Sequence, residues 1–218
     1  MDELELLKQQ WQTREQSLPH LSFDDIYKML LKKSSSIVKW IFYISIAEII
    51  FWTLLSFLLP ESNTKFTDDI GLNSFLIVAN VFNYLVFGVF IFLFYKNYRK
   101  ISTTDSIKEL MTNILSTRKT VKYFVIYNVA TSALLIIGSN FYYYLNQDMV
   151  FRVMTEDYGI RNIPQERFMN MFFLIQVLFG IVIIGLVLLF YRVVYGILLR
   201  RLRKNYKELE KIEVWKKS

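Results

Sequence analysis

The sequence predicts an all-α polytopic membrane protein with four transmembrane helices, and three features of the chain predict it. Four apolar runs are each about 23 to 25 residues long, which is enough to cross a hydrocarbon core of about 30 Å as a helix. They are residues 37–59, 72–95, 121–145 and 168–191. Lys and Arg are distributed unevenly between the polar segments that separate these runs. The two halves of the chain also resemble each other, which predicts two parallel helical-hairpin repeats.

Residues 1–20 are expected to form a cytoplasmic N-terminal helix with no counterpart in the second half. A narrow apolar stripe lies at helical spacings among Gln, Glu, Lys, Arg and Thr. A stripe of this width cannot stabilise a free helix, so the segment has to dock on this protein's own cytoplasmic helices, on a partner or on lipid. Lipid is the least favoured, because the segment is acidic overall. The candidate partner-binding residues are those of the stripe, Leu4, Leu7, Trp11 and Leu18.

The first repeat is expected to cover residues 21–96 and to begin with a cytoplasmic amphipathic helix. Ser22 and Asp25 have the spacing of a capping box, in which each side chain accepts a hydrogen bond from the backbone amide of the other residue. A helix is therefore expected to begin near Phe23 and to lie against the membrane or the bundle. It precedes the junction Ser34-Ser35-Ser36 and the first span.

The second repeat is expected to cover residues 97–192. Ser22 and Asp25 recur in it as Ser102 and Asp105, which predicts a second capped cytoplasmic helix from about Thr103 to Ser116. Each unit contains two spans, so its copy has the same orientation and the repeats are parallel. The alternative is chance similarity between apolar segments with common flanking residues.

Residues 193–218 are expected to form a basic cytoplasmic C-terminal helix. The net charge is about +5 from Lys96 to Lys122 and about +6 from Arg192 to Ser218, whereas the other two connecting segments are acidic overall. Lys and Arg are retained in cytoplasmic loops. Both termini are therefore expected on the cytoplasmic side of a bacterial inner membrane.

Among the four apolar runs, Glu48 is the only ionisable side chain in the interior of a run. It lies at the midpoint of residues 37–59. A carboxylate at that depth costs about 3 kcal/mol and is expected to face the bundle interior. Asn83 lies at a matching depth in the second run and is the expected hydrogen-bond partner. The pair is either a structural clamp between two helices or part of a proton-linked or cation-linked transport site.

The composition excludes several classes of protein, and no cofactor or metal is expected. The chain has no Cys and a single His, His20, so it can form neither a sulfur metal site nor a bis-His haem site. It contains no P-loop and no intramembrane serine protease motif, and it is not expected to be an enzyme. The net charge of +7 is explained by the basic cytoplasmic segments, so no nucleic acid is expected as a partner.

The motif Leu7-Lys8-x-x-Trp11-Gln12, followed by the capped helix at Ser22 and a span, resembles a group of poorly characterised four-span bacterial inner-membrane proteins. Some members of that group are similar to membrane-bound anti-sigma regulators. The resemblance covers roughly the first 60 residues and implies no catalytic residue. It implies a cytoplasmic N-terminal helix that holds a protein partner at the membrane.

These features together predict a non-enzymatic inner-membrane interaction or regulatory protein. It is expected to act as a membrane anchor or accessory subunit through its cytoplasmic helices. The expected partners are membrane lipids and a protein, either in a membrane complex or at its cytoplasmic face. The alternative is a small transporter or channel subunit that uses Glu48.

Overall fold

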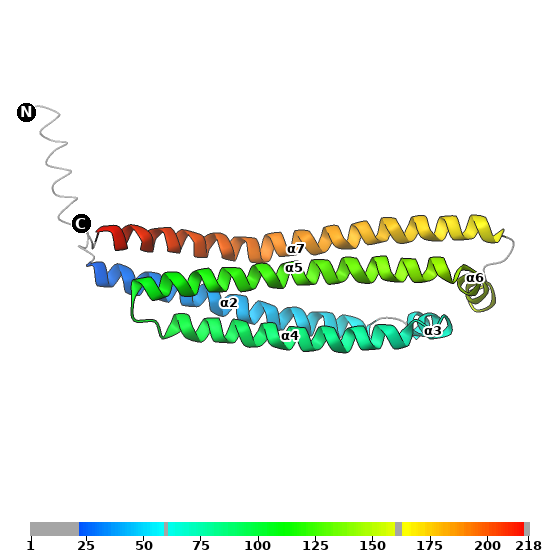
Figure 1. Ribbon diagram of the computed structural model, residues 1–218, viewed down its shortest axis with the longest axis horizontal. Helices are drawn as coiled ribbons and strands as arrows, with labels where there is room; N and C mark the ends of the chain where they lie inside the picture. Colours follow the sequence, from blue (N-terminus) through cyan, green and yellow to red (C-terminus); the bar gives the residue numbers. More distant parts are fainter. Residues whose placement is uncertain (1–21, 59–60, 160–162, 216–218) are drawn as a thin grey trace, which may run out of the picture.

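The structure is a computed structural model, and it describes residues 22–58, 61–159 and 163–215 (Figure 1). Within these ranges the chain is helical apart from short turns and contains no strand. The helices are α2 (Phe23–Phe57), α3 (Glu61–Asp69), α4 (Asn73–Ser102), α5 (Ile107–Leu145), α6 (Gln147–Glu156) and α7 (Gln165–Trp215). The predicted all-α fold is confirmed.

Four helices, α2, α4, α5 and α7, are long and apolar enough to cross a membrane, and each contains one of the predicted spans. In the most apolar stretches of α4 and α7, only 6% of the residues are buried inside the protein. Contiguous apolar surface of this extent is unfavourable in water and is the surface that lipid covers. The prediction of four membrane-crossing helices is therefore supported by length, composition and exposure together.

The four long helices form an antiparallel bundle in which α2 packs against α4 and α7, and α5 packs against the same two helices. The first residue of α2, Phe23, and the last residue of α7, Trp215, lie at one end of the bundle together with the α4–α5 turn (Figure 1). We call this the tail end. The opposite end holds α3 and α6, and we call it the loop end (Figure 1).

The structure corrects the predicted division between cytoplasmic helices and spans, because each pair is one continuous helix. α2 runs without a break through Ser34, and α7 extends over 51 residues, or about 75 Å. The Ser34 hydroxyl is buried and accepts a hydrogen bond from Asn205 Nδ2 of α7 at 3.0 Å, so this part of α2 packs inside the bundle. The tail end is thus an uninterrupted extension of the bundle, with Leu110 and Leu202 in its core.

The capping box predicted at the start of the first repeat is confirmed. Asp25 N donates to Ser22 Oγ at 3.1 Å, and Ser22 N donates to Asp25 Oδ2 at 3.2 Å. The hydrogen bonds from Ser22 hold the pKa of the Asp25 carboxyl below its ordinary value. α2 begins at Phe23, as the motif predicts.

The corresponding prediction for the second repeat is wrong. Ser102 is the last residue of α4, and its hydroxyl donates back to the Arg99 carbonyl at 2.8 Å. α5 begins at Ile107 and is capped by Ser106, whose Oγ accepts from Glu109 N at 3.2 Å. The similar sequences at the two positions therefore fold differently, because α4 extends as far as Ser102, the first residue of the second copy.

The loop end has a small core of its own, made where α3 and α6 fold across the ends of the long helices (Figure 1). Phe66 of α3 and Ile70, which directly follows α3, pack with Tyr143 of α5 and Val150 of α6. Tyr142 Oη donates to the Ile70 carbonyl at 2.6 Å, next to the turn at Gly71, whose φ of 73° favours glycine. The sequence indicates only that the segments containing α3 and α6 are acidic, and in the structure they form a helical cap.

Candidate functional site

Glu48 is the most deeply buried carboxylate that the structure describes in a predicted span, and it joins α2 to α7. It is 5% exposed. Its Oε1 accepts a hydrogen bond from Tyr191 Oη, and its Oε2 accepts one from Tyr195 Oη at 3.1 Å. The two tyrosines are four residues apart, which places both hydroxyls on the same face of α7. Each carboxylate oxygen therefore has its own donor.

The rings of both tyrosines are packed in an aromatic cluster with α5. Phe124 contacts Tyr191 edge to face, with ring centroids 6.1 Å apart, and Tyr195 with centroids 5.8 Å apart. Phe94 of α4 completes the cluster, with its ring centroid 5.4 Å from that of Phe124. Offset and edge-to-face rings of this kind pack favourably and hold the hydroxyls in one position. All four long helices thus contribute to the surroundings of Glu48.

The expected pair of Glu48 and Asn83 is wrong. Asn83 Oδ1 accepts a hydrogen bond from Tyr127 Oη of α5 at 2.9 Å, so it links α4 to α5. Asn83 also lines a cavity of about 390 Å³ at the level of the predicted spans, which includes Asn80, Asn128 and Ser132. The cavity reaches Tyr191, so it ends beside the Glu48 cluster without being lined by Glu48 itself.

The register of α2 against α7 explains why Glu48 meets Tyr191 and Tyr195. Two hydrogen bonds fix it: Glu48 lies beside Tyr191, and Ser34 lies beside Asn205. Tyr191 is the last residue of the run 168–191, whereas Glu48 is the midpoint of the run 37–59. The two runs are therefore offset by about 11 residues, or about 16 Å. Glu48 is level with one boundary of the fourth run and not with its middle.

Beyond Glu48, the tail-end interior is held by polar side chains that pair across helices. Asn97 Nδ2 of α4 donates to Thr120 Oγ1 of α5 at 3.0 Å, and Asn113 Nδ2 of α5 donates to Thr104 Oγ1 at 2.9 Å. Tyr27 Oη of α2 donates to the Thr104 carbonyl at 2.9 Å. Burial raises the pKa of the Tyr27 hydroxyl above its ordinary value.

A groove of about 410 Å³ lies at the tip of the tail end, where α2, the α4–α5 turn and α7 meet. Its apolar lining comes from Phe23, Tyr27, Ile107 and Ile212, and its charged lining includes acidic side chains from three segments. Phe23 lies outside the predicted spans and is 55% exposed. The tip therefore offers both a recess and exposed apolar surface.

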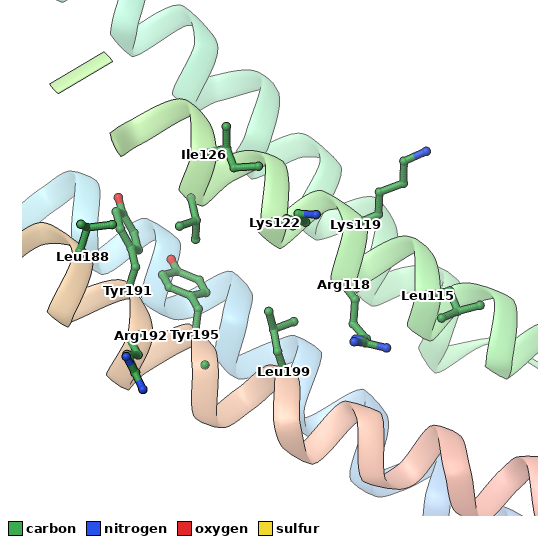
Figure 2. A pocket seen from close by; sticks show the side chains of 12 residues that line it. Leu115, Arg118, Lys119, Lys122, Ile126, Leu188, Tyr191, Arg192, Tyr195 and Leu199 are labelled. Carbon is green, nitrogen blue, oxygen red and sulfur yellow. The ribbon is translucent and has the colours of Figure 1, made fainter. Parts of the chain in front are cut away.

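A second, larger groove of about 580 Å³ lies between α5 and α7, beside the Glu48 cluster (Figure 2). Arg118 extends from α5 towards α7, while Tyr191 and Tyr195 point from α7 towards α5 (Figure 2). The basic residues that line this groove are Arg118, Lys119, Lys122 and Arg192. It therefore combines an aromatic and aliphatic interior with a basic lining.

The candidate partner-binding residues Leu4, Leu7, Trp11 and Leu18 lie outside the described residues, so the structure does not test them. Within the described ranges, no group of three His, Asp or Glu side chains is placed to hold a metal ion. Sequence reasoning missed Tyr191 and Tyr195 as the partners of Glu48. Their spacing of four residues on one helix was the available signal.

Residues 24–214 match the family described as "Domain of unknown function (DUF8845)". The match runs over all four long helices and includes Glu48, both grooves and the loop-end cap, apart from Phe23. No curated protein and no solved structure matches the chain.

Proposed function

This chain belongs to the DUF8845 family, and we propose that it is a non-enzymatic interaction or regulatory protein of a bacterial inner membrane. It acts as an anchor or accessory subunit for a protein partner, which binds at the tail end of the bundle. The tail end faces the cytoplasm in this proposal, because the basic segments from Lys96 to Lys122 and from Arg192 to Trp215 lie there.

The observation that carries the proposal is exposed apolar surface at the tip of the tail end. Phe23 and Met29 of α2 are 55% and 59% exposed, and Val214 of α7 is 62% exposed. All three lie outside the four apolar runs, so lipid tails are not expected to cover them. Apolar surface beside a recess is typical of a protein-binding site.

The rigidity of the tail end supports the same proposal. α2, α5 and α7 reach it as continuous helices, and Leu110, Ile114, Leu202 and Leu209 fill the space between them with no exposed surface. A surface carried on packed helices loses little freedom when a partner binds, which favours affinity. The candidate residues Leu4, Leu7, Trp11 and Leu18 precede Phe23 in the chain and are proposed to contribute to the same partner site.

The proposal is tested by site-specific photocrosslinking in cells, with a photoreactive amino acid placed at Phe23 and, separately, at Val214. Both positions should capture the same protein. The captured partner, once purified, should bind the detergent-solubilised chain, and Phe23→Glu/Val214→Glu should weaken that binding at least about tenfold, or about 1.4 kcal/mol. The variant should melt as the native protein does, because both side chains are exposed.

Thr112→Glu is the matched control, because Thr112 is an exposed residue of α5 near the same end and its hydroxyl bonds only within its own helix. It should bind the partner normally. Trp11→Ala tests the proposed contribution of residues 1–20 separately, and it should also weaken partner binding. Different adducts at the two positions, or equal loss of binding in the double variant and in Thr112→Glu, would reject a partner site at the tip.

A second candidate function is a small transporter or channel subunit. The cavity of about 390 Å³ lined by Asn80, Asn83, Asn128 and Ser132 favours it, because it lies among the predicted spans and ends beside Glu48 and its tyrosines. This candidate requires a proton-coupled flux in proteoliposomes that Glu48→Gln abolishes. It is the less favoured candidate because each oxygen of Glu48 is already paired with a tyrosine hydroxyl.

A further inference from the structure

We propose that the groove between α5 and α7 binds an anionic phospholipid. The basic lining residues would hold the phosphate group, and the apolar part of the groove would hold the upper part of an acyl chain. This site is separate from the partner site proposed at the tip, and it depends neither on that partner nor on which end of the bundle faces the cytoplasm.

The groove lies at the depth where a phospholipid headgroup meets the hydrocarbon. Lys122 is in the first turn of the predicted run 121–145, and Arg192 directly follows the run 168–191. Both residues line the same groove although they belong to antiparallel helices. Two independent predictions of the membrane boundary therefore coincide at this groove. Lys and Arg at such a boundary commonly contact lipid phosphates.

The electrostatics of the groove favour an anion. Four of its lining residues are basic and none is acidic. Among the described residues, none of these four side chains forms a salt bridge. Lys119 points away from α7 (Figure 2), so it adds positive potential at the rim, whereas Arg118 extends across the groove.

Arg118 supplies the most specific indication of a ligand. Its Nε atom is buried, yet it has no hydrogen-bond partner in the described structure. A buried guanidinium nitrogen without an acceptor is costly, and a phosphate oxygen is the acceptor that the planar guanidinium group binds best. A phosphate in the groove would satisfy this atom and would also lie near Lys122 and Arg192.

The apolar lining distinguishes a lipid from a free phosphate. Leu188 and Ile126 line the groove and are 48% and 51% exposed, and both lie inside predicted spans. The groove is therefore continuous with the surface that lipid covers. On the other side it is closed by Tyr191 and Tyr195, whose hydroxyls Glu48 holds. A small soluble anion would leave this apolar surface uncovered, whereas an acyl chain would bury it.

The charge requirement is tested by native mass spectrometry of the detergent-purified protein titrated with dioleoyl phosphatidylglycerol or dioleoyl phosphatidylcholine, which carry the same acyl chains. The native protein should bind the anionic lipid at least tenfold more tightly. Arg118→Gln/Lys122→Gln/Arg192→Gln should reduce that preference below threefold. The control Arg203→Gln/Lys204→Gln/Lys207→Gln removes the same charge from exposed positions of α7 outside the groove and should keep the preference.

The acyl-chain requirement is tested by filling the groove without changing its charge. Gly196 lines the groove, and no atom lies within 4 Å of a Cβ added there. Gly196→Leu should therefore weaken phosphatidylglycerol binding at least tenfold. Gly185→Leu is the matched control, because a Cβ at Gly185 is equally unobstructed and lies outside the groove.

Four results would overturn the proposal. The first is equal binding of the two lipids by the native protein. The second is equal loss of preference in the groove and control charge variants, which would indicate diffuse attraction. The third is normal lipid binding by Gly196→Leu, which would show that no acyl chain occupies the groove. The fourth is displacement of the lipid by an equal concentration of soluble glycerol phosphate, which would identify a site for free anions.

Discussion

Glu48 accepts hydrogen bonds from two tyrosines of α7, and Asn205 of α7 donates one to Ser34 of α2. These residues show what a buried polar side chain contributes to a bundle of apolar helices. Apolar contacts tolerate sliding of one helix along another, whereas a hydrogen bond between two side chains is satisfied in one register. The Glu48 and Ser34 contacts indicate the same register, so together they fix α2 against α7.

Removing the carboxylate of Glu48 should therefore destabilise the bundle more than changing it to an amide. Glu48→Ala leaves two buried tyrosine hydroxyls without their acceptor, and should lower the free energy of unfolding in detergent by about 1–3 kcal/mol. Glu48→Gln keeps an acceptor for one hydroxyl and offers an NH2 group to the other, so it should remain within about 1 kcal/mol of the native protein.

Thermal unfolding of the purified protein measures both changes. Asn128→Ala is a suitable control, because the described bond of that side chain goes to the Phe124 carbonyl of its own helix. Equal melting temperatures for Glu48→Ala and the native protein would show that the Glu48 cluster does not hold the two helices together. A stable Glu48→Gln protein that has lost a measured proton flux would instead favour transport.

At the scale of elements, helix ends are set by local hydrogen bonds and helix lengths by packing. The motif at Ser22 and Asp25 starts α2, but the same spacing at Ser102 and Asp105 starts nothing, because α4 continues through Ser102. Ile101 is completely buried in the main core, which favours continuing α4 to this point. Burial of a large side chain contributes about 1.5–3 kcal/mol, which exceeds the contribution of about 1 kcal/mol from a cap.

The two serines near the α4–α5 turn should consequently respond differently to the same substitution. Ser106→Ala removes the acceptor of the Glu109 amide and should destabilise the protein by about 1 kcal/mol. Ser102→Ala removes only a bond from an exposed hydroxyl back to the Arg99 carbonyl, and should change the stability by less than about 0.5 kcal/mol. Chemical denaturation in detergent compares the two. A larger loss of stability in Ser102→Ala than in Ser106→Ala would support the predicted helix cap at Ser102. It would also support the sequence repeat that depends on that cap.

At the scale of the whole molecule, the parts that the sequence predicts are those encoded by neighbouring residues. The four long helices follow from uninterrupted apolar runs, and the start at Phe23 follows from its cap. The partner of Glu48 could not be predicted in this way, because it depends on how far α2 slides along α7. The loop-end core depends similarly on contacts between Phe66 and Tyr143, which are far apart in the chain.

Charge and fold together predict the orientation of the bundle. The basic segments from Lys96 to Lys122 and from Arg192 to Trp215 belong to the tail end, whereas α3 and α6, each with more acidic than basic side chains, form the loop end. Basic segments are retained on the cytoplasmic side during insertion. The loop end should therefore face the periplasm.

Because the chain contains no Cys, single cysteines can report this orientation without background labelling. Lys65→Cys and Tyr158→Cys, at the loop end, should react in intact cells with a maleimide that does not cross the inner membrane. Lys108→Cys and Lys211→Cys, at the tail end, should react only after the inner membrane is permeabilised. All four native side chains are exposed, so a lack of reaction reflects the membrane and not burial within the protein. Labelling of Lys108→Cys before permeabilisation would show that the orientation is the reverse of the predicted one. The proposed partner site would then lie outside the cytoplasm.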